Sequence, residues 1–380
     1  MLKNKKLKVS NIVPHTDEWH RYRLSGIGAS EASVAYYGVN KYEGVVELYH
    51  RKIDNVQEFG KMREHGDDAL ERMESGLWME PTISDMWTYW DGSRMSHISN
   101  KKNGMKVREF LDSPGYVVNN DYPWLFASPD RVIPSGSASL VSEIDTLTDD
   151  CPLELKNVSF NGAKRWDGTV PKEYVIQMYQ QMICMDCKYA EIARLIDGWD
   201  FMVIPIIRDD SFAESMIRVT KSFWYDLIMP AKEYIARREE CRIKGDVTGV
   251  EKWNSKIMEL EPEPVSVADK KFISDTAEIE EGSEMGGDNV LLRLAQQHKV
   301  IQRIIAELEK NSNVLEVKLS NMHRKFKVER FKFDDGSYTR YYRRANSINY
   351  MLDNRLKGES LPPPEFVREQ MKKIDLNFLK

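Results

Sequence analysis

The sequence predicts an α/β or α+β domain followed by a helical extension, and three observations support this fold class. From about residue 17 to 245, apolar residues recur with periods near 3.6 and near 2 in alternating segments, as in helices and strands. An acidic stretch rich in glycine follows at 246–288. Beyond it, apolar residues recur at steps of three and four. We therefore expect a core at 1–245, an acidic linker or mobile loop at 246–288, and a long heptad helix, a basic hairpin and a tail at 289–380.

The composition indicates a globular protein with no overall attraction for nucleic acid. Hydrophobic residues make up 41% of the 380 residues, which supports a substantial core, and the formal net charge is −5. Any contact with DNA would depend on local basic surface. Apolar runs of the length of a signal peptide or of a membrane span, about 18 residues, are absent from the sequence. We therefore expect a cytoplasmic protein without a membrane segment.

The third part of the chain carries a regular pattern and a turn signal. The heptad positions are Leu294, His298, Ile301, Ile305, Leu308, Ser312, Leu315, Leu319, Met322 and Phe326. This helix would pack on its own domain or join subunits. Asp335-Gly336 between β-prone residues predicts a hairpin. The Lys- and Arg-rich stretch 318–344, with its tyrosines, would bind DNA or form an ordinary solvated surface.

The four cysteines are expected to be reduced thiols. Cys184 and Cys187 are spaced as in a metal-binding pair, but they lie in a predicted helix and only Cys151 and Cys241 remain as further ligands. Buried thiols that pack as small apolar residues are the favoured interpretation.

The strings around Asp130, Glu154 and Lys156 are the strongest indication of chemistry. Glu154 and Lys156 are two residues apart in an apolar segment, so in a strand both point to one face. Phosphodiester hydrolysis needs neutralised phosphate charge and an activated water, which divalent ions bound by carboxylates can supply. An exposed strand face with a weak Glu–Lys pair is the commoner explanation of this triplet taken alone.

Three further strings support a nuclease, each with an ordinary alternative. Glu80 precedes Pro81 at an expected helix start and shares the apolar face with Trp87; a glutamate that favours the helix dipole is the alternative. Gln177 and Gln181 lie one helical turn apart, where they would orient water, a metal ligand or DNA, or form polar surface.

The third string is at residues 19–31. Ser30 is expected to begin a helix, whose free N–H groups bind anions, and Arg23 would contact the same phosphate. A plain N-cap serine beside a surface arginine is the alternative.

In this order, the strings at 19–31, 76–81, 128–130 and 153–156 and the helix bearing Gln177 resemble the lambda-type phage exonucleases. This is the YqaJ-like viral recombinase family of the PD-(D/E)xK nuclease superfamily, and the resemblance covers residues 19–209. It implies a restriction-endonuclease-like core, which is a central mixed sheet flanked by helices. The extension at 289–380 lies outside it.

The resemblance also implies roles for individual residues. It assigns metal binding to Glu80, Asp130, Glu154 and the backbone carbonyl of Leu155. Lys156 would activate the water, and Gln177 would be a further catalytic residue. Arg23 and Ser30 would bind the 5′ phosphate of a DNA end, and Gln181 and Lys41 would make further DNA contacts.

The activity implied is digestion of one strand of duplex DNA from its 5′ end. The cofactor implied is Mg²⁺, with Mn²⁺ able to substitute and two ions bound. The partners implied are double-stranded DNA ends, further copies of the chain in a trimeric ring, and a phage single-strand annealing protein. The gene would be carried by a phage or prophage, and the protein would act in the bacterial cytoplasm. An endonuclease or nickase on the same fold and a non-catalytic DNA-end-binding scaffold are the alternatives.

The chain departs from the family pattern in three places. Asp130 and Glu154 are 24 residues apart (154 minus 130), a wider gap than usual, which leaves Glu143 as a rival ligand. Arg131 stands where a glycine usually follows the motif aspartate. The basic residue expected after Ser30 is at best Lys41.

Overall fold

A five-stranded mixed sheet forms the centre of the first of two compact units in the computed structural model. The units are Met1–Glu278 and Ile279–Lys380. The structure describes residues 7–10, 12, 16–53, 67–166, 169–276, 289–327, 330–332, 338–344 and 347–353. In sheet order, the strands are β3 (Leu111–Asp112), β6 (Arg131–Ile133), β7 (Cys151–Val158), β8 (Tyr189–Ile196) and β9 (Asp200–Ile207).

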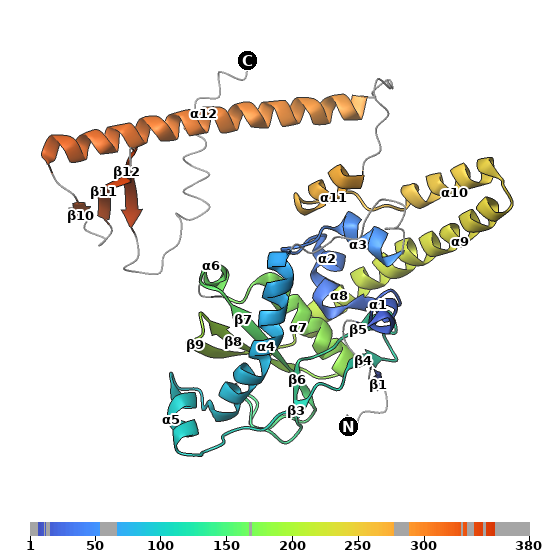
Figure 1. Ribbon diagram of the computed structural model, residues 1–380, viewed down its shortest axis with the longest axis horizontal. Coiled ribbons are helices and arrows are strands. Elements are labelled where there is room, and N and C mark those ends of the chain that lie inside the picture. The colour runs from blue at the N-terminus through green and yellow to red at the C-terminus, as the bar shows by residue number, and fades with distance from the viewer. Residues whose placement is uncertain are drawn as a thin grey trace. The chain divides into compact units, whose positions relative to one another are not determined.

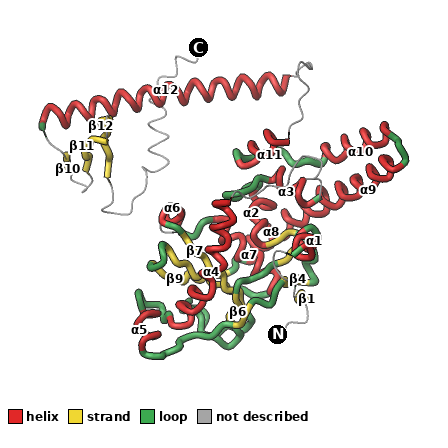
Figure 2. Tube along the Cα trace, viewed as in Figure 1, coloured by secondary structure: helices red, strands yellow, loops and turns green. Residues whose placement is uncertain are grey.

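Only one neighbouring pair in this sheet is parallel. β7 and β8 run in the same direction and are connected through helix α7 (Lys172–Met185), whereas β3–β6, β6–β7 and β8–β9 are antiparallel. Parallel neighbours need such a crossover, and a helix is its usual form. The mixed sheet flanked by helices confirms the predicted fold class (Figures 1 and 2).

Helices α4 (Asp67–Tyr89) and α7 cover opposite faces of this sheet. Alternate residues of a strand point to opposite faces. On one face, Glu191 of β8 accepts a hydrogen bond of 2.7 Å from the indole nitrogen of Trp87 on α4. On the other face, Glu154 of β7 accepts one of 2.6 Å from Gln181 on α7. The core lies in these two interfaces, where Leu153, Ile192 and other apolar side chains are fully buried.

The remaining elements of the first unit surround this centre. Two short sheets pair β1 (Leu7–Ser10) with β4 (Tyr116–Asn119) and, in parallel, β2 (Ile27–Gly28) with β5 (Leu125–Phe126). The other helical elements are α1 (Asp17–Arg23), η1 (Ala29–Glu31), α2 (Ala32–Tyr37), α3 (Val45–Lys52), α5 (Ser96–Lys102), α6 (Phe160–Ala163), η2 (Lys164–Trp166), α8 (Asp210–Ser222), the π-helical η3 (Phe223–Ile228) and α9 (Met229–Ile243).

The stretch predicted as an acidic linker, 246–288, begins with two helices. α10 (Val247–Glu259) packs on α9, where the Tyr234 and Trp253 rings are 5.4 Å apart. α11 (Ala268–Thr276) packs on α3, where Asp269 Oδ1 accepts a 3.0 Å hydrogen bond from the backbone N–H of Val46. Of the glycines that suggested a linker, Gly245 lies in the α9–α10 turn and Gly249 lies in the first turn of α10, whereas Gly282, Gly286 and Gly287 lie outside the described residues. Residues 277–288 lie outside the described residues.

The second unit contains α12 (Asn289–Phe326), a helix of 38 residues over the segment with the heptad pattern. β10 (Arg330–Lys332) pairs antiparallel with β11 (Tyr338–Arg344), as the Asp335-Gly336 signal predicts, although 333–337 lie outside the described residues. The sequence did not predict β12 (Ser347–Asp353), which adds a third antiparallel strand. The tail from 354 onward also lies outside the described residues.

Candidate functional site

The register between β6 and β7 brings Asp130 next to Glu154. Arg131 pairs with Leu153, so the preceding residue Asp130 lies across from Glu154. The backbone N–H of Leu155 donates a hydrogen bond of 2.7 Å to Asp130 Oδ2. Two carboxylates that are far apart in sequence therefore meet where β6 begins.

The long gap between these carboxylates is an extension of the same hairpin. The backbone N–H of Gly136 donates to the Leu147 carbonyl at 2.8 Å, and that of Leu147 donates to the Ser137 carbonyl at 2.9 Å. Glu143 lies beyond these pairs in an exposed position, where the Ser142 hydroxyl donates to it at 3.0 Å. Glu143 thus lies toward the tip, away from Asp130, and the structure does not support it as the rival ligand.

Glu154 is the centre of a hydrogen-bond network. It is 3% exposed, and its Oε1 accepts hydrogen bonds from the Lys156 ammonium and, at 2.6 Å, from Gln177 Nε2. Its Oε2 accepts from Gln181 Nε2 at 2.6 Å. The glutamines are one turn apart on α7, as the sequence predicts, and they hold a buried carboxylate rather than forming polar surface. Tyr174, also on α7, places its ring 4.9 Å from the Lys156 nitrogen.

Glu80 reaches the same site from α4. It interacts electrostatically with Asp130, Glu154 and Lys156, and its Oε2 lies 3.8 Å from an Arg131 guanidinium nitrogen. The sequence-based expectation that a helix begins at this point is wrong, because Pro81 lies inside α4. The Ser84 hydroxyl donates to the Glu80 carbonyl at 2.9 Å in this turn of the helix.

The pKa values of Asp130 and Glu80 are both raised. Loss of hydration, together with the charges of Glu154 and Glu80, raises the pKa of Asp130 well above its usual value. Burial also raises the pKa of Glu80, which Arg131 partly offsets and Glu154 increases. For Lys156, burial acts to lower the pKa, but the Glu154 and Asp130 carboxylates outweigh it and raise the pKa. Lys156 is therefore an ammonium group, and the acids beside it outnumber it.

The chemistry of this site fits a hard divalent cation. Glu80, Asp130 and Glu154 supply carboxylate oxygens of the kind that Mg²⁺ prefers. Within the described residues, no three acidic, histidine or cysteine side chains already form a ligand cluster. Both Glu154 oxygens are bonded to Lys156, Gln177 and Gln181, so a cation would compete with these donors.

Arg23 and Ser30 lie at a second cluster of charges. The cluster centres on the buried carboxylate of Glu31, which pairs with Arg23 at 2.7 Å, Arg51 at 2.6 Å and Lys52 at 2.6 Å. These cations keep the pKa of Glu31 well below its usual value although burial acts to raise it. Arg23 is therefore an ion-paired side chain and not a plain surface arginine.

Ser30 does not begin a helix as the sequence suggested. It is exposed in the short 3-10 helix η1, whose N-cap is Gly28, and the Gly28 N–H donates to Glu31 Oε2 at 2.8 Å. Glu31 thus occupies the position where an anion was expected at the helix start.

Lys41 packs against Tyr42 and makes no hydrogen bond or ion pair with Glu80, Asp130 or Glu154 among the described residues. Its ammonium is 5.1 Å from the centre of the Tyr42 ring, and Tyr42 interacts electrostatically with Tyr174.

Three further residues of this architecture were not predicted from the sequence, namely Gln180, Arg51 and Lys52. Gln180 Nε2 donates to the carbonyls of Ile27 at 2.7 Å and Phe126 at 2.9 Å, so it joins the β2–β5 pair to α7. Its position among the glutamines of this helix was the available signal. Arg51 and Lys52 belong to the basic end of α3, but their pairing with Glu31 depends on tertiary structure.

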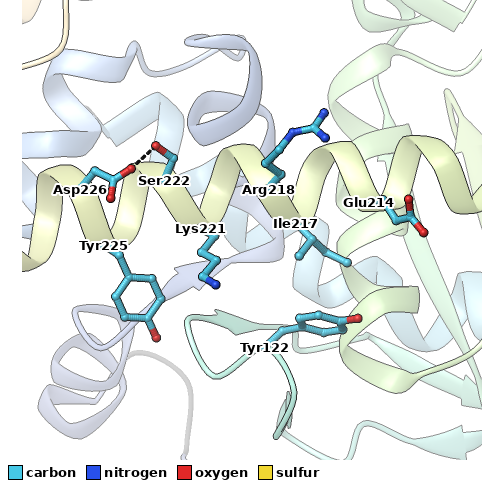
Figure 3. Close-up of a pocket in the computed structure, with 8 residues that line it drawn as sticks. All are labelled: Tyr122, Glu214, Ile217, Arg218, Lys221, Ser222, Tyr225 and Asp226. Atoms are coloured by element: carbon cyan, nitrogen blue, oxygen red, sulfur yellow. Dashed lines mark hydrogen bonds between the residues drawn. The ribbon is translucent and has the colours of Figure 1, made fainter.

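A separate cavity of about 490 Å³ lies along α8 and η3 (Figure 3). Its lining residues are Tyr122, Glu214, Ile217, Arg218, Lys221, Ser222, Tyr225 and Asp226. None of the predicted site residues is among them. The cysteines are free thiols, of which Cys151, Cys184 and Cys187 are buried, as expected for small apolar side chains.

Comparison with known proteins identifies the class of the core. Residues 18–188 match the family model of the YqaJ-like viral recombinase domain. This match confirms the resemblance of the motifs. Among the described residues, no helix is long and apolar enough to cross a membrane.

The relatives share modest identity with the chain. The uncharacterized protein YqaJ of Bacillus subtilis (strain 168) is 25% identical over 236 residues, which are 58% of this chain and 63% of that protein. The alkaline exonuclease of Laribacter hongkongensis superimposes with a TM-score of 0.42 and 17% identity, covering 59% of this chain and 98% of its own. A phage-related exonuclease of Haemophilus somnus 129PT superimposes with a TM-score of 0.31 and 14% identity, covering 54% of this chain and 96% of its own.

Proposed function

We propose that this protein is a metal-dependent deoxyribonuclease that digests one strand of duplex DNA from its 5′ end and leaves a 3′ single strand. The observation that carries this proposal is the meeting of Asp130, Glu154 and Lys156 with Glu80 beside the start of β6. The match to the viral recombinase domain agrees with a role in DNA recombination.

The metal-binding role falls to Glu80, Asp130, Glu154 and the backbone carbonyl of Leu155. Mg²⁺ fits these oxygen donors, and Mn²⁺ is expected to substitute; the number of carboxylates suits two ions. When bound, divalent cations neutralise the phosphate charge and lower the pKa of bound water. The protein itself holds the three carboxylates close together, beside fewer side-chain cations than carboxylates.

Lys156 acts on the water as a charged hydrogen-bond donor. Its raised pKa keeps it protonated, so it orients the attacking water and favours the hydroxide form by its charge instead of accepting a proton. Gln177 and Gln181 fix the orientation of Glu154 through both of its oxygens. Gln177 bonds to Glu154 Oε1, the oxygen that Lys156 also contacts, whereas Gln181 bonds to Oε2. Of the two glutamines, Gln177 is therefore the one on the side of Lys156.

Arg23 and Ser30 supply the preference for a DNA end. The cluster around Glu31 contains three cations, Arg23, Arg51 and Lys52, and two carboxylates, because Arg51 pairs with Glu43 as well as with Glu31. One positive charge remains, and Arg23, whose side chain is 22% exposed, is placed to offer it to a 5′ phosphate. Gln181 supports the site by bonding to Glu154, and Lys41 adds a cation that contacts the DNA backbone. We extend the proposal to a homo-oligomer, a trimeric ring by resemblance, that acts in the bacterial cytoplasm with a phage single-strand annealing protein.

The deciding experiment compares end-labelled linear duplex DNA with covalently closed circles in the presence of Mg²⁺. We expect nucleotides to be released from the 5′ ends of linear DNA while circles stay intact. Nicked circles would identify an endonuclease, and failure to cleave either substrate would identify a DNA-end-binding scaffold. Omission of Mg²⁺ and addition of a chelator serve as controls.

A further inference from the structure

Arg131 occupies a position between the candidate site and α4. It is the first residue of β6, directly after Asp130, and stands where the resembled motif has a glycine. Its side chain is 16% exposed, and one of its terminal nitrogens lies 3.8 Å from Glu80 Oε2. The site therefore contains a second cation, beside Lys156, on the side from which Glu80 arrives.

The surroundings of Arg131 leave its charge available to Glu80. The guanidinium lies 5.5 Å from the centre of the Phe110 ring, and Nη1 donates a 2.6 Å hydrogen bond to the Asp130 carbonyl. Nε is buried without a hydrogen-bond partner in the described part of the chain. Asp112, the other carboxylate near it, lies 3.9 Å away and is 95% exposed, so solvent screens that contact.

We propose that Arg131 is a positioning residue that acts through Glu80 and sets the affinity of the site for divalent cations. This inference rests on the proposed function, because it assumes that Glu80 is a metal ligand. The guanidinium balances the Glu80 carboxylate in the metal-free protein. To bind, a divalent cation has to draw the Glu80 carboxylate away from the Arg131 guanidinium. The positive charge of Arg131 also repels the entering cation.

The spacing between Arg131 and Glu80 supports competition instead of a permanent ion pair. At 3.8 Å, the two groups attract each other but make no direct hydrogen bond. Glu80 is itself 26% exposed, so it has room to turn toward Asp130 and Glu154. A glycine at this position would leave Lys156 as the cation that interacts with Glu80.

The test is calorimetric titration of the full chain with Mg²⁺ in the absence of DNA. In Arg131→Gln, which keeps a polar side chain but removes the charge, we expect Mg²⁺ to bind about tenfold more tightly, equal to about 1.4 kcal/mol. Arg131→Lys keeps the charge and is expected to stay within about threefold of the original protein. Arg131→Met serves as a second neutral variant if Arg131→Gln folds poorly.

A double-mutant cycle separates action through Glu80 from a direct effect on the ion. In a Glu80→Gln background, we expect the change from arginine to glutamine at 131 to alter affinity by less than about twofold. An undiminished effect in that background, or unchanged affinity in both neutral variants, would overturn the inference while leaving the nuclease proposal intact. If the unaltered protein binds no divalent cation, both proposals fail.

Discussion

At the scale of single residues, the site depends on how one buried carboxylate is satisfied. Glu154 accepts hydrogen bonds from one ammonium and two side-chain amides, which together replace the water that burial removes. A buried charge is tolerated when its partners are present and is costly when one is removed. Substitutions here therefore need a measurement of folding beside one of activity.

We expect Glu154→Gln and Lys156→Ala each to reduce Mg²⁺-dependent DNA digestion by at least about a hundredfold, because each removes a charge from the reacting site. The measurement is release of labelled nucleotides, with circular dichroism to confirm folding. Glu143→Gln, a matched change in the exposed hairpin, should keep full activity. Undiminished digestion by either site variant would refute the assignment.

The raised pKa of Asp130 predicts that metal binding depends on pH. Burial and the nearby charge of Glu154 raise the pKa of Asp130, so in the metal-free protein Asp130 keeps its proton at pH values where an ordinary aspartate has lost it. A cation that binds Asp130 has to displace this proton. Mg²⁺ affinity should therefore weaken as pH falls through this raised pKa. Calorimetry in buffers of different ionisation enthalpy would detect the released proton. Affinity that does not vary from pH 8 to pH 5 would contradict the prediction.

Arg23→Ala should slow digestion of 5′-phosphorylated ends by about ten- to a hundredfold, the value of one charged hydrogen bond. Ends that carry a 5′ hydroxyl should be affected less. The loss of the ion pair with Glu31 also perturbs the fold, so melting temperatures need to be compared. Arg21→Ala, an exposed change on the same helix, is the control. Equal slowing on both kinds of end would argue against a phosphate site.

At the scale of elements, α7 joins the two charge clusters. Gln177 and Gln181 point to Glu154, while Gln180 bonds to the backbone of β2 and β5, which precede Ser30 and Asp130. This helix is also the crossover between the parallel strands β7 and β8. Its placement therefore fixes the carboxylate site and the Arg23 region together.

Gln180→Leu should lower the free energy of unfolding by about 1–3 kcal/mol, because it leaves two buried carbonyls without their donor. Chemical denaturation would measure this change. Gln180→Glu offers no amide donor at similar volume and should be at least as destabilising. A loss below about 0.5 kcal/mol for both variants would show that β2 and β5 do not depend on this contact.

Local patterns predicted strand-like segments, the spacing of the α7 glutamines and the α12 helix, because each is encoded by periodicity within one segment. The central mixed sheet was implied by the family resemblance. The position of Glu80 in the middle of α4 was not predictable in this way, since Pro81 usually marks a helix start. Ser30 was misassigned because the Glu31 carboxylate caps Gly28 from within the turn. The pairs of Glu31 with Arg51 and Lys52, and of Glu80 with Arg131, join segments far apart in sequence and needed the tertiary structure.

At the scale of the whole molecule, every predicted site residue belongs to the unit Met1–Glu278. The helices α10 and α11 also belong to this unit, so a division at residue 245 would remove elements that pack on α9 and α3. The second unit contributes α12 and a three-stranded sheet, and we propose that it adds DNA contact or subunit contact.

A chain ending at residue 278 should fold and retain Mg²⁺-dependent hydrolysis, because both charge clusters and the core of this unit remain. Thermal unfolding and nucleotide release from short duplexes are the measurements. A chain ending at residue 245 should be much less stable, because it lacks α10 and α11. Loss of hydrolysis by a folded 1–278 chain would show that the second unit contributes directly to catalysis.

In the hairpin between Ile133 and Cys151, the length of the loop can change without changing the alignment of the two strands. A slip of one residue between β6 and β7 would turn Asp130 to the opposite face of the sheet. Residues added or removed at the tip leave that alignment unchanged, because backbone pairs below the tip hold it. The tip is therefore where related sequences can differ in length, and where a fluorescent label could be attached without moving the carboxylates.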